Sequence, residues 1–292
     1  MNMDRFDVDS FNKLLRSSKM GRKIVYTDLT GSTMDDARRL AHEVMEYPHG
    51  TIVISEQQTK ARGARDHKWD ATNTGNIYAS FVLHLSPLCK TFEGRFDVEV
   101  AACLAVFQVV QKFGVKNVVP KWPNDLWVRG HKLAGFLVED GRFDIPGTTS
   151  CLCILGMGIN VNADVRRSNE LQSLATSLVC ERGGQYVNRE EFLAEVCASL
   201  EQVLVKNREE NFATFLKENL FQTNCQISVS NNLSGKVLDG MFMAISNNWD
   251  VKFIDTQNGE VMRGNSIMYS IRPKVINKIL IVFASTHNSR VA

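Results

Sequence analysis

The sequence predicts an α+β protein in two parts, a larger mixed-sheet domain with helices packed on it and a small C-terminal antiparallel β-barrel or sandwich. Apolar and β-branched strands alternate with helices as far as about residue 220. From about residue 225, short strands separated by Asn and Gly replace them. At 292 residues and 44% hydrophobic composition, the chain can bury one large core and one smaller one. We therefore predict domains at residues 1–222 and 223–292.

The first elements are a helical lead, a strand and a second helix. Residues 4–20 predict the lead, which is too short for a helix-turn-helix DNA-binding domain. Residues 22–29 predict a strand. Ser32 and Thr33 begin the next helix, because carboxylates follow these hydroxyl caps in the first turn, and the helix ends before Pro48. A hydroxyl pair at such a position is more often a cap than a binding site, so the residues alone leave its role open.

A basic loop follows the strand predicted at residues 51–56. Residues 60–68 hold four cationic side chains and no apolar anchor other than two alanines. This composition fits a solvated loop. It also fits a loop that gathers charge around a phosphate through Arg side chains and backbone N–H groups. The next strand enters at Gly75 and Asn76.

A strongly apolar helix at residues 96–113 and a strand at 115–119 lead to the segment 120–140, P-K-W-P-N-D-L-W-V-R-G-H-K-L-A-G-F-L-V-E-D. Proline fixes φ, and Asn and Asp bond to local backbone, so W-P-N-D predicts a turn. Short strands at residues 126–128 and 133–139 then flank a tight connection.

This hairpin is expected to hold Lys121, Asp125 and Lys132 near one another on rigid backbone. Gly135, inside the second strand, leaves a place where a ligand or another backbone comes close. The same residues also fit a surface hairpin with solvated lysines.

The remaining predicted elements have the pattern of helices and strands that pack in a core, with no sign of a catalytic or binding motif. A strand at residues 151–155 runs into G-M-G-I-N, which lacks the third glycine, the following helix and the downstream acidic residue of a dinucleotide-binding fingerprint. Helices at 188–204 and 211–219 are amphipathic. Short strands are predicted at residues 226–229, 235–238, 242–245, 251–254, 260–262 and 279–283.

Composition narrows the classes of partner. The net charge of +2 gives no argument for nucleic acid or lipid. No apolar run reaches the length of a membrane span. Seven cysteines without a C-x-x-C motif favour buried free thiols in a reducing compartment, and hence a cytoplasmic protein.

The polar side chains of the hairpin and the basic loop are lysines, arginines, a carboxylate and amides. No Ser-His or Cys-His dyad and no zinc motif accompanies them. Such a set suits neutralisation of negative charge more than proton abstraction. Adenylation, in which a carboxylate attacks an α-phosphate, is chemistry of this type.

Residues 121–139 resemble, without a gap, the K-W-P-N-D-L…K-L-A-G-(I/F)-L-V-E signature of the biotin protein ligases, or holocarboxylase synthetases. The resemblance extends over residues 22–178. It implies a class II synthetase-like catalytic domain that binds biotin and ATP, an SH3-like C-terminal barrel, and the form of the enzyme without an N-terminal DNA-binding domain.

The resemblance also implies a reaction and its partners. With Mg²⁺, the enzyme would activate biotin as biotinyl-AMP and transfer it to one lysine of the biotin-acceptor domain of carboxylases. It would do so as a monomer or homodimer in the cytoplasm, with no nucleic acid or membrane as partner.

Site residues follow by position. Lys132 would bridge the carboxylate and the α-phosphate, Arg62 would clamp the phosphate, and Asp125 would either hold Mg²⁺ or receive the proton of the incoming lysine. Biotin contacts fall on Ser32, Thr33, Gln58, Arg62, Trp122, Lys132 and Gly135. Nucleotide contacts fall on Arg62, Trp69, Asn76, Lys121, Asn124, Lys132, Asn160 and Arg272.

The basic loop departs from the family pattern G-R-G-R-x-G-x-x-W at Ala61, Ala64 and Asp66. We expect the loop to be mobile without ligand, and Arg65 to replace the arginine missing at position 64. Two alternatives remain. A lipoate- or octanoate-protein ligase would show an R-R-x-x-G-G-G loop and no K-W-P-N-D-L. A non-enzymatic, biotin-responsive DNA-binding regulator would need the longer N-terminal domain.

Overall fold

The computed structural model describes residues 5–43, 49–64, 67–85, 92–144, 151–164 and 175–274. The chain forms two compact units, the first comprising Met1–Pro120 and Asn124–Phe215, the second Lys121–Pro123 and Leu216–Ala292. The predicted α+β class, with a mixed sheet followed by a C-terminal antiparallel sheet, is confirmed. The predicted boundary after residue 222 stays a prediction. Among the described residues, no helix is both long enough and apolar enough to cross a bilayer.

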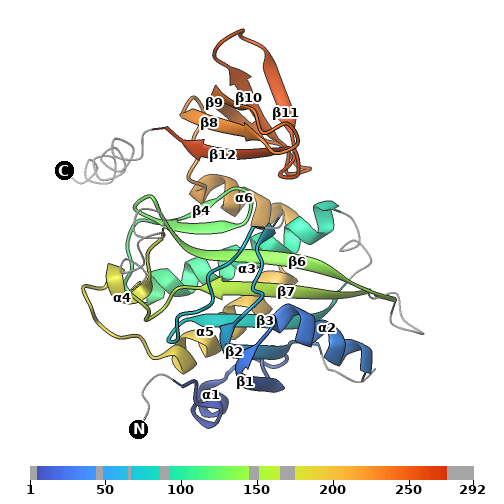
Figure 1. The fold of residues 1–292 in the computed structure, drawn as a ribbon, viewed down its shortest axis with the longest axis vertical. Coiled ribbons are helices and arrows are strands. Elements are labelled where there is room, and N and C mark those ends of the chain that lie inside the picture. Colours follow the sequence, from blue (N-terminus) through green and yellow to red (C-terminus); the bar gives the residue numbers. More distant parts are fainter. Residues whose placement is uncertain are drawn as a thin grey trace, which may run out of the picture. The chain divides into compact units, whose positions relative to one another are not determined.

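The first unit is built on a seven-stranded sheet with the order β1-β2-β3-β7-β6-β5-β4 (Figure 1). Its strands are β1 (Ile24–Thr30), β2 (Thr51–Gln58), β3 (Ile77–Leu85), β4 (Val118–Lys121), β5 (Asp125–Val128), β6 (His131–Asp144) and β7 (Cys151–Ile159). β1 pairs with β2 in parallel, whereas β2, β3, β7, β6 and β5 pair in antiparallel order. The sheet is therefore mixed.

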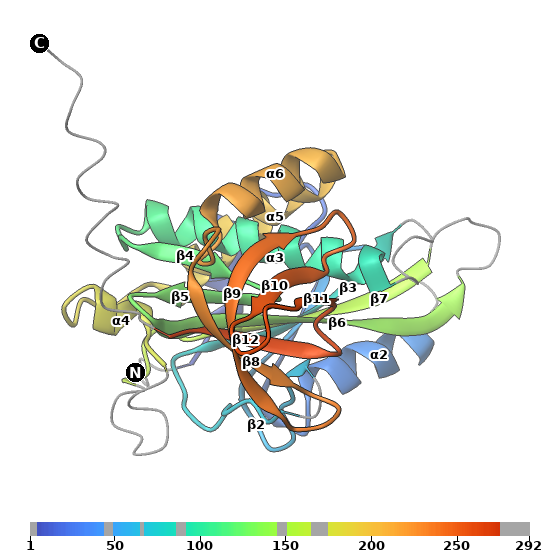
Figure 2. The same ribbon diagram turned by 90° about the horizontal axis from the view of Figure 1, so that it is seen from above.

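Helices cover both faces of this sheet. Figure 2 shows α2 (Thr33–Glu43) on one face, and α3 (Phe92–Lys112) with α5 (Arg189–Val205) on the other. α2 packs on the sheet through a core cluster that includes Met34 of the helix, Val82 of β3 and Ile154 of β7. The unit also contains α1 (Val8–Leu14), α4 (Leu178–Glu181) and the part of α6 (Arg208–Glu218) that ends at Phe215.

Local sequence signals explain several element ends. Asn188 caps α5, because its Oδ1 accepts a hydrogen bond from the Glu191 N–H at 2.7 Å. Arg129 and Gly130 have φ values of 48° and 86° and form the two-residue connection between β5 and β6. The predicted helix over residues 4–20 is wrong in length: α1 begins after its cap, Asp7, and ends at Leu14.

A buried ion pair fastens α5 to the sheet. The Arg189 guanidinium donates to the Glu56 carboxylate of β2 at 2.8 and 3.0 Å. It also donates to the Asn76 carbonyl at 2.9 Å. Two charges with so little exposure are tolerated because each is paired and hydrogen-bonded.

The second unit contains a five-stranded antiparallel sheet with the order β11-β10-β9-β8-β12. Its strands are β8 (Gln226–Asn231), β9 (Val237–Ile245), β10 (Val251–Asp255), β11 (Val261–Gly264) and β12 (Tyr269–Pro273). The strands predicted at 235–238 and 242–245 are one strand, β9, and β12 was not predicted. The predicted strand at 279–283 lies outside the described residues.

Part of the central hairpin segment belongs to this second unit. The Trp122 indole N–H donates to the Trp249 carbonyl at 3.0 Å, and the Trp122 backbone N–H donates to Asn219 Oδ1 at 3.2 Å. Both indoles are fully buried. The segment 121–123 therefore serves as core for the second unit.

Candidate active site

Glycines form a floor on the sheet face that α2 partly covers. Gly135 of β6 pairs with Gly158 of β7, and the Trp69 indole lies against both. A Cβ on Gly135 or Gly158 would lie 2.9 or 2.4 Å from the nearest Trp69 ring atom, so a larger residue would displace the ring. The room that Gly135 leaves is thus real, and a tryptophan of the basic loop is placed over it.

Lys132 and Asp125 form an ion pair at one end of this floor. The Lys132 Nζ lies 2.6 Å from Asp125 Oδ1 and 5.1 Å from the centroid of the Trp69 ring. The predicted proximity of Lys132 and Asp125 is confirmed. The hairpin creates it, because Asp125 is paired with Gly135, and a bulge after Leu126 shifts the register before Lys132.

Lys121 has contacts within the second unit. Its Nζ donates to the Trp122 carbonyl at 3.3 Å and lies 6.0 Å from the centroid of the Phe221 ring. The predicted nucleotide contact of Lys121 and the predicted biotin contact of Trp122 stay predictions.

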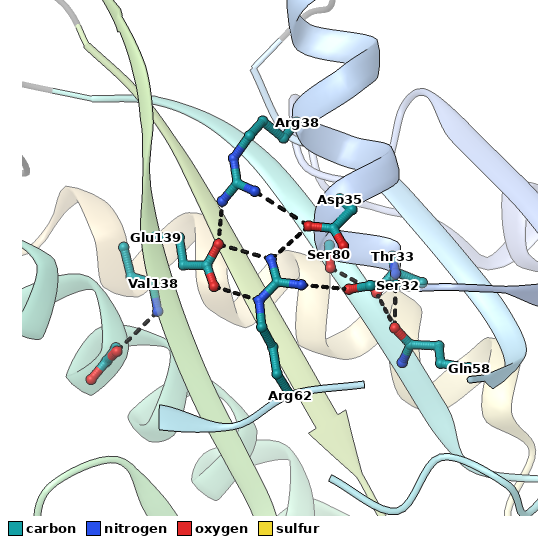
Figure 3. A network of polar contacts seen from close by, with 10 residues as sticks. Ser32, Thr33, Asp35, Arg38, Gln58, Arg62, Ser80, Val138 and Glu139 are labelled. Atoms are coloured by element: carbon teal, nitrogen blue, oxygen red, sulfur yellow. Dashed lines mark hydrogen bonds and ion pairs between the residues drawn. The ribbon is translucent and has the colours of Figure 1, made fainter. Parts of the chain in front are cut away.

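A polar cluster lies at the N-terminus of α2 and contains Ser32, Thr33, Gln58 and Ser80 (Figure 3). Gln58 Oε1 accepts hydrogen bonds from the Thr33 N–H at 2.8 Å and the Thr33 hydroxyl at 3.2 Å. That hydroxyl lies 2.8 Å from Ser80 Oγ. The structure therefore brings together three residues that the resemblance assigns to biotin. Ser80 was missed, and its only signal is a small polar residue within an apolar strand.

An ion network adjoins the polar cluster (Figure 3). The Arg62 guanidinium donates to Glu139 at 2.7 and 2.9 Å, to Asp35 at 2.8 Å and to Ser32 Oγ at 3.2 Å. Arg38 also contacts Glu139 and Asp35. Sequence reasoning missed Asp35, Arg38 and Glu139, although Glu139 is the first charged residue after the apolar run F-L-V.

The network changes the protonation equilibria of its members. Hydrogen bonds to Glu139 raise the pKa of Arg62 above its ordinary value. Burial acts to raise the pKa of Glu139, but hydrogen bonds from Arg62 and Arg38 outweigh it and hold that pKa below its ordinary value. The pair is therefore charged at neutral pH.

The described part of the basic loop has contacts at both ends. Arg62 anchors one end through its carboxylate partners, and Trp69 anchors the other through the glycine floor. Between them, the Gly63 N–H donates to the His67 carbonyl at 2.6 Å. The expected mobility of the loop without ligand stays a prediction. Residues 65 and 66 lie outside the described residues, so the predicted role of Arg65 is untested.

Three asparagines predicted to contact the nucleotide are buried, and their amides bond to backbone. Asn76 Oδ1 accepts from the backbone N–H of Val161 at 2.9 Å. Asn160 Nδ2 donates to the Thr176 carbonyl at 3.0 Å, and Asn124 Nδ2 donates to the Phe136 carbonyl. These bonds hold segments around the site, and the nucleotide contacts stay predictions. Arg272 is exposed on β12 of the second unit, and its nucleotide contact also stays a prediction.

The chain is similar to known proteins both in sequence and in fold. The model of the biotin/lipoate A/B protein ligase family matches residues 26–160. The chain is 27% identical over 250 residues to the bifunctional ligase/repressor BirA of Bacillus spizizenii, covering 84% of this chain and 73% of that protein.

It is 28% identical over 206 residues to the biotin--[acetyl-CoA-carboxylase] ligase of Mycobacterium tuberculosis, covering 68% of this chain and 71% of that protein. Among solved structures, the biotin protein ligase from Aquifex aeolicus in complex with biotin and ATP has the same fold, with a TM-score of 0.68, 23% identity and coverage of 86% of this chain and 99% of that chain.

Proposed function

We propose that the chain is a member of the biotin/lipoate A/B protein ligase family, whose model matches residues 26–160, and that it activates biotin with ATP as biotinyl-AMP and transfers it to a lysine of the biotin-acceptor domain of carboxylases. The name of the Mycobacterium tuberculosis relative supports biotin as substrate and a carboxylase as acceptor. The Aquifex aeolicus structure, solved with biotin and ATP, supports both small molecules. The geometry of the site supports a placement of biotin with its ureido ring at the polar cluster and its carboxylate near Lys132.

The polar cluster beside an uncharged glycine floor is the observation that carries the proposal. Gln58 uses its Oε1 on Thr33, so its two amide hydrogens have no acceptor among the described residues. Ser32 Oγ accepts from Arg62, which leaves its own hydrogen to donate. Two donors side by side suit the carbonyl oxygen of the biotin ureido ring. The uncharged surface that the glycines and the Trp69 indole form beside these donors suits an aliphatic ring and chain.

The carboxylate of biotin would then lie toward Lys132. Glu139 lies four positions after Gly135 on β6, roughly 13 Å along the strand, which fits the length of a small bicyclic ring with an acid chain. The carboxylate attacks the α-phosphate of ATP, and pyrophosphate leaves in line. The Lys132 ammonium neutralises the negative charge that grows in this transition state, and its bond to Asp125 fixes its position.

Mg²⁺ would be held by Asp125 together with the phosphates of ATP. One carboxylate plus substrate phosphates is an ordinary magnesium site, so Asp125 fits this ion although no cluster of three metal-ligating residues exists among the described residues. Bound there, Mg²⁺ would offset phosphate charge.

In the second step, the acceptor lysine amine attacks the acyl carbon of the mixed anhydride, forming an amide and releasing AMP. A proton leaves the amine, and Asp125 is the candidate to receive it if Asp125 does not hold Mg²⁺. The phosphate clamp predicted for Arg62 stays a proposal, and it requires Arg62 to exchange protein carboxylates for phosphate. We also propose that the protein resides in the cytoplasm, a reducing compartment, because five cysteines among the described residues are free thiols.

Mass spectrometry of a carboxylase acceptor domain tests this function. The domain is incubated with the protein and MgATP, with biotin in one arm and lipoate in the other. We expect one biotinyl addition on one lysine, with AMP and pyrophosphate as products. A lipoyl addition without a biotinyl one would replace the proposal by lipoate ligation, and no addition in either arm would reject both.

A further inference from the structure

The network of Arg62, Glu139, Asp35 and Arg38 joins three elements that meet at the polar cluster (Figure 3). Arg62 comes from the basic loop, Glu139 from β6, and Asp35 and Arg38 from the first turns of α2. Two positive and two negative side chains give the network no net charge. It therefore needs no bound anion to balance it.

Arg62 is almost fully engaged within this network. A guanidinium has five N–H hydrogens. Four of the Arg62 hydrogen bonds go to protein acceptors, two of them to Glu139 in a fork. Such paired contacts fix the plane of the guanidinium as well as its position. In this arrangement, Arg62 affects a ligand indirectly, by positioning other groups of the protein that contact the ligand.

What Arg62 holds is the Ser32 hydroxyl and the start of the loop that ends at Trp69. By donating to Ser32 Oγ at 3.2 Å, Arg62 turns the hydroxyl hydrogen away from itself. We propose that Glu139 is a positioning residue of the biotin site, which fixes Arg62 and thereby sets Ser32 as a donor and the loop over the glycine floor. This inference rests on the proposed function, because biotin is the ligand of the polar cluster there.

The test must separate positioning from support of the strand, and Glu99 provides the matched control. The Glu99 carboxylate, from α3, accepts a hydrogen bond from the Val138 N–H at 2.9 Å, one residue before Glu139 on β6. Glu99→Gln perturbs the same strand without touching the Arg62 network. Glu139→Gln keeps the size of the side chain and removes its charge.

Calorimetric titration of biotin without ATP gives the dissociation constant per folded molecule. We expect about tenfold weaker binding by Glu139→Gln, the lower end for a charge-assisted hydrogen bond because the pair is partly exposed. Glu99→Gln should bind within about twofold of the wild type even if its melting temperature falls.

Arg62→Gln breaks the same pair from the loop side and serves as the test if Glu139→Gln does not fold. The double variant should bind biotin about as weakly as the weaker-binding single variant, since each substitution breaks the same Arg62–Glu139 pair. Equal binding by the wild type and the single variants, or effects that multiply in the double variant, would overturn the inference. A wild type that binds no biotin would instead overturn the proposed function.

Discussion

Lys132→Ala removes the ammonium group that pairs with Asp125 at the end of the glycine floor where the biotin carboxylate is proposed to lie. Its ion pair is 2.6 Å long, and its side chain is 33% exposed. A pair of this exposure contributes about 1 kcal/mol or less to stability. In a domain of this size, such a loss lowers the melting temperature by about 2–4 °C. The variant should therefore fold.

The expected effect on catalysis is much larger. Removing one oriented donor that acts on charge in a transition state costs about 3–4 kcal/mol, or a factor of roughly 10² to 10³ in rate. The assay is biotin-dependent release of pyrophosphate from ATP. Lys116→Ala is the control, because Lys116 is exposed in the same unit. It should leave the rate unchanged.

Two results together would refute the reasoning about Lys132. One is a circular dichroism spectrum and melting temperature close to those of the wild type. The other is release of pyrophosphate by Lys132→Ala at a rate within about threefold of the wild type, since about 3 kcal/mol predicts a far larger loss.

Three further predictions follow from other parts of the chain. Gly158→Ala should displace the Trp69 indole, because the new Cβ would lie 2.4 Å from the ring, and biotin binding measured by calorimetry should weaken at least about tenfold. Burial acts to raise the pKa of Glu201, but hydrogen bonds from residues 18–20 outweigh it and lower the pKa from 4.5 to about 2. The stability that Glu201 contributes is thus complete above pH 4.5 and lost as the pH falls toward 2. The free energy of unfolding of Glu201→Gln, measured with urea, should therefore be lower than that of the wild type at pH 7, and the difference should disappear at the acid end. A difference that is the same at every pH would contradict this. Arg65→Gly should release biotinyl-adenylate and label serum albumin more than the wild type does, if Arg65 replaces the arginine missing at position 64; equal labelling would exclude that role.

Local rules predicted the part of the site that lies within one hairpin. Asp125 and Lys132 are seven residues apart in sequence, and a tight turn at Gly130 leaves few arrangements for them. Gly135 was recognised because a glycine inside a strand signals close approach by another group. The cap at Asn188 follows equally from local chemistry.

Contacts between distant segments were beyond such rules. Arg62 and Glu139 are 77 residues apart, and nothing in either local sequence specifies the other as a partner. The Trp122 indole N–H bonds to the backbone of Trp249, 127 residues away, and the local sequence of Trp122 does not specify that partner. β12 ends in Pro273, which argues against a central strand, but β12 is an edge strand, where proline is tolerated.

The central claim is that the polar cluster and Lys132 hold biotin for adenylation. Crystals of the protein grown with biotin and non-hydrolysable ATP test it most directly. The account predicts the ureido oxygen within hydrogen-bond distance of Ser32 Oγ or Gln58 Nε2, with the biotin carboxylate beside Lys132 Nζ. Biotin bound away from both groups, or in the reverse orientation, would contradict it.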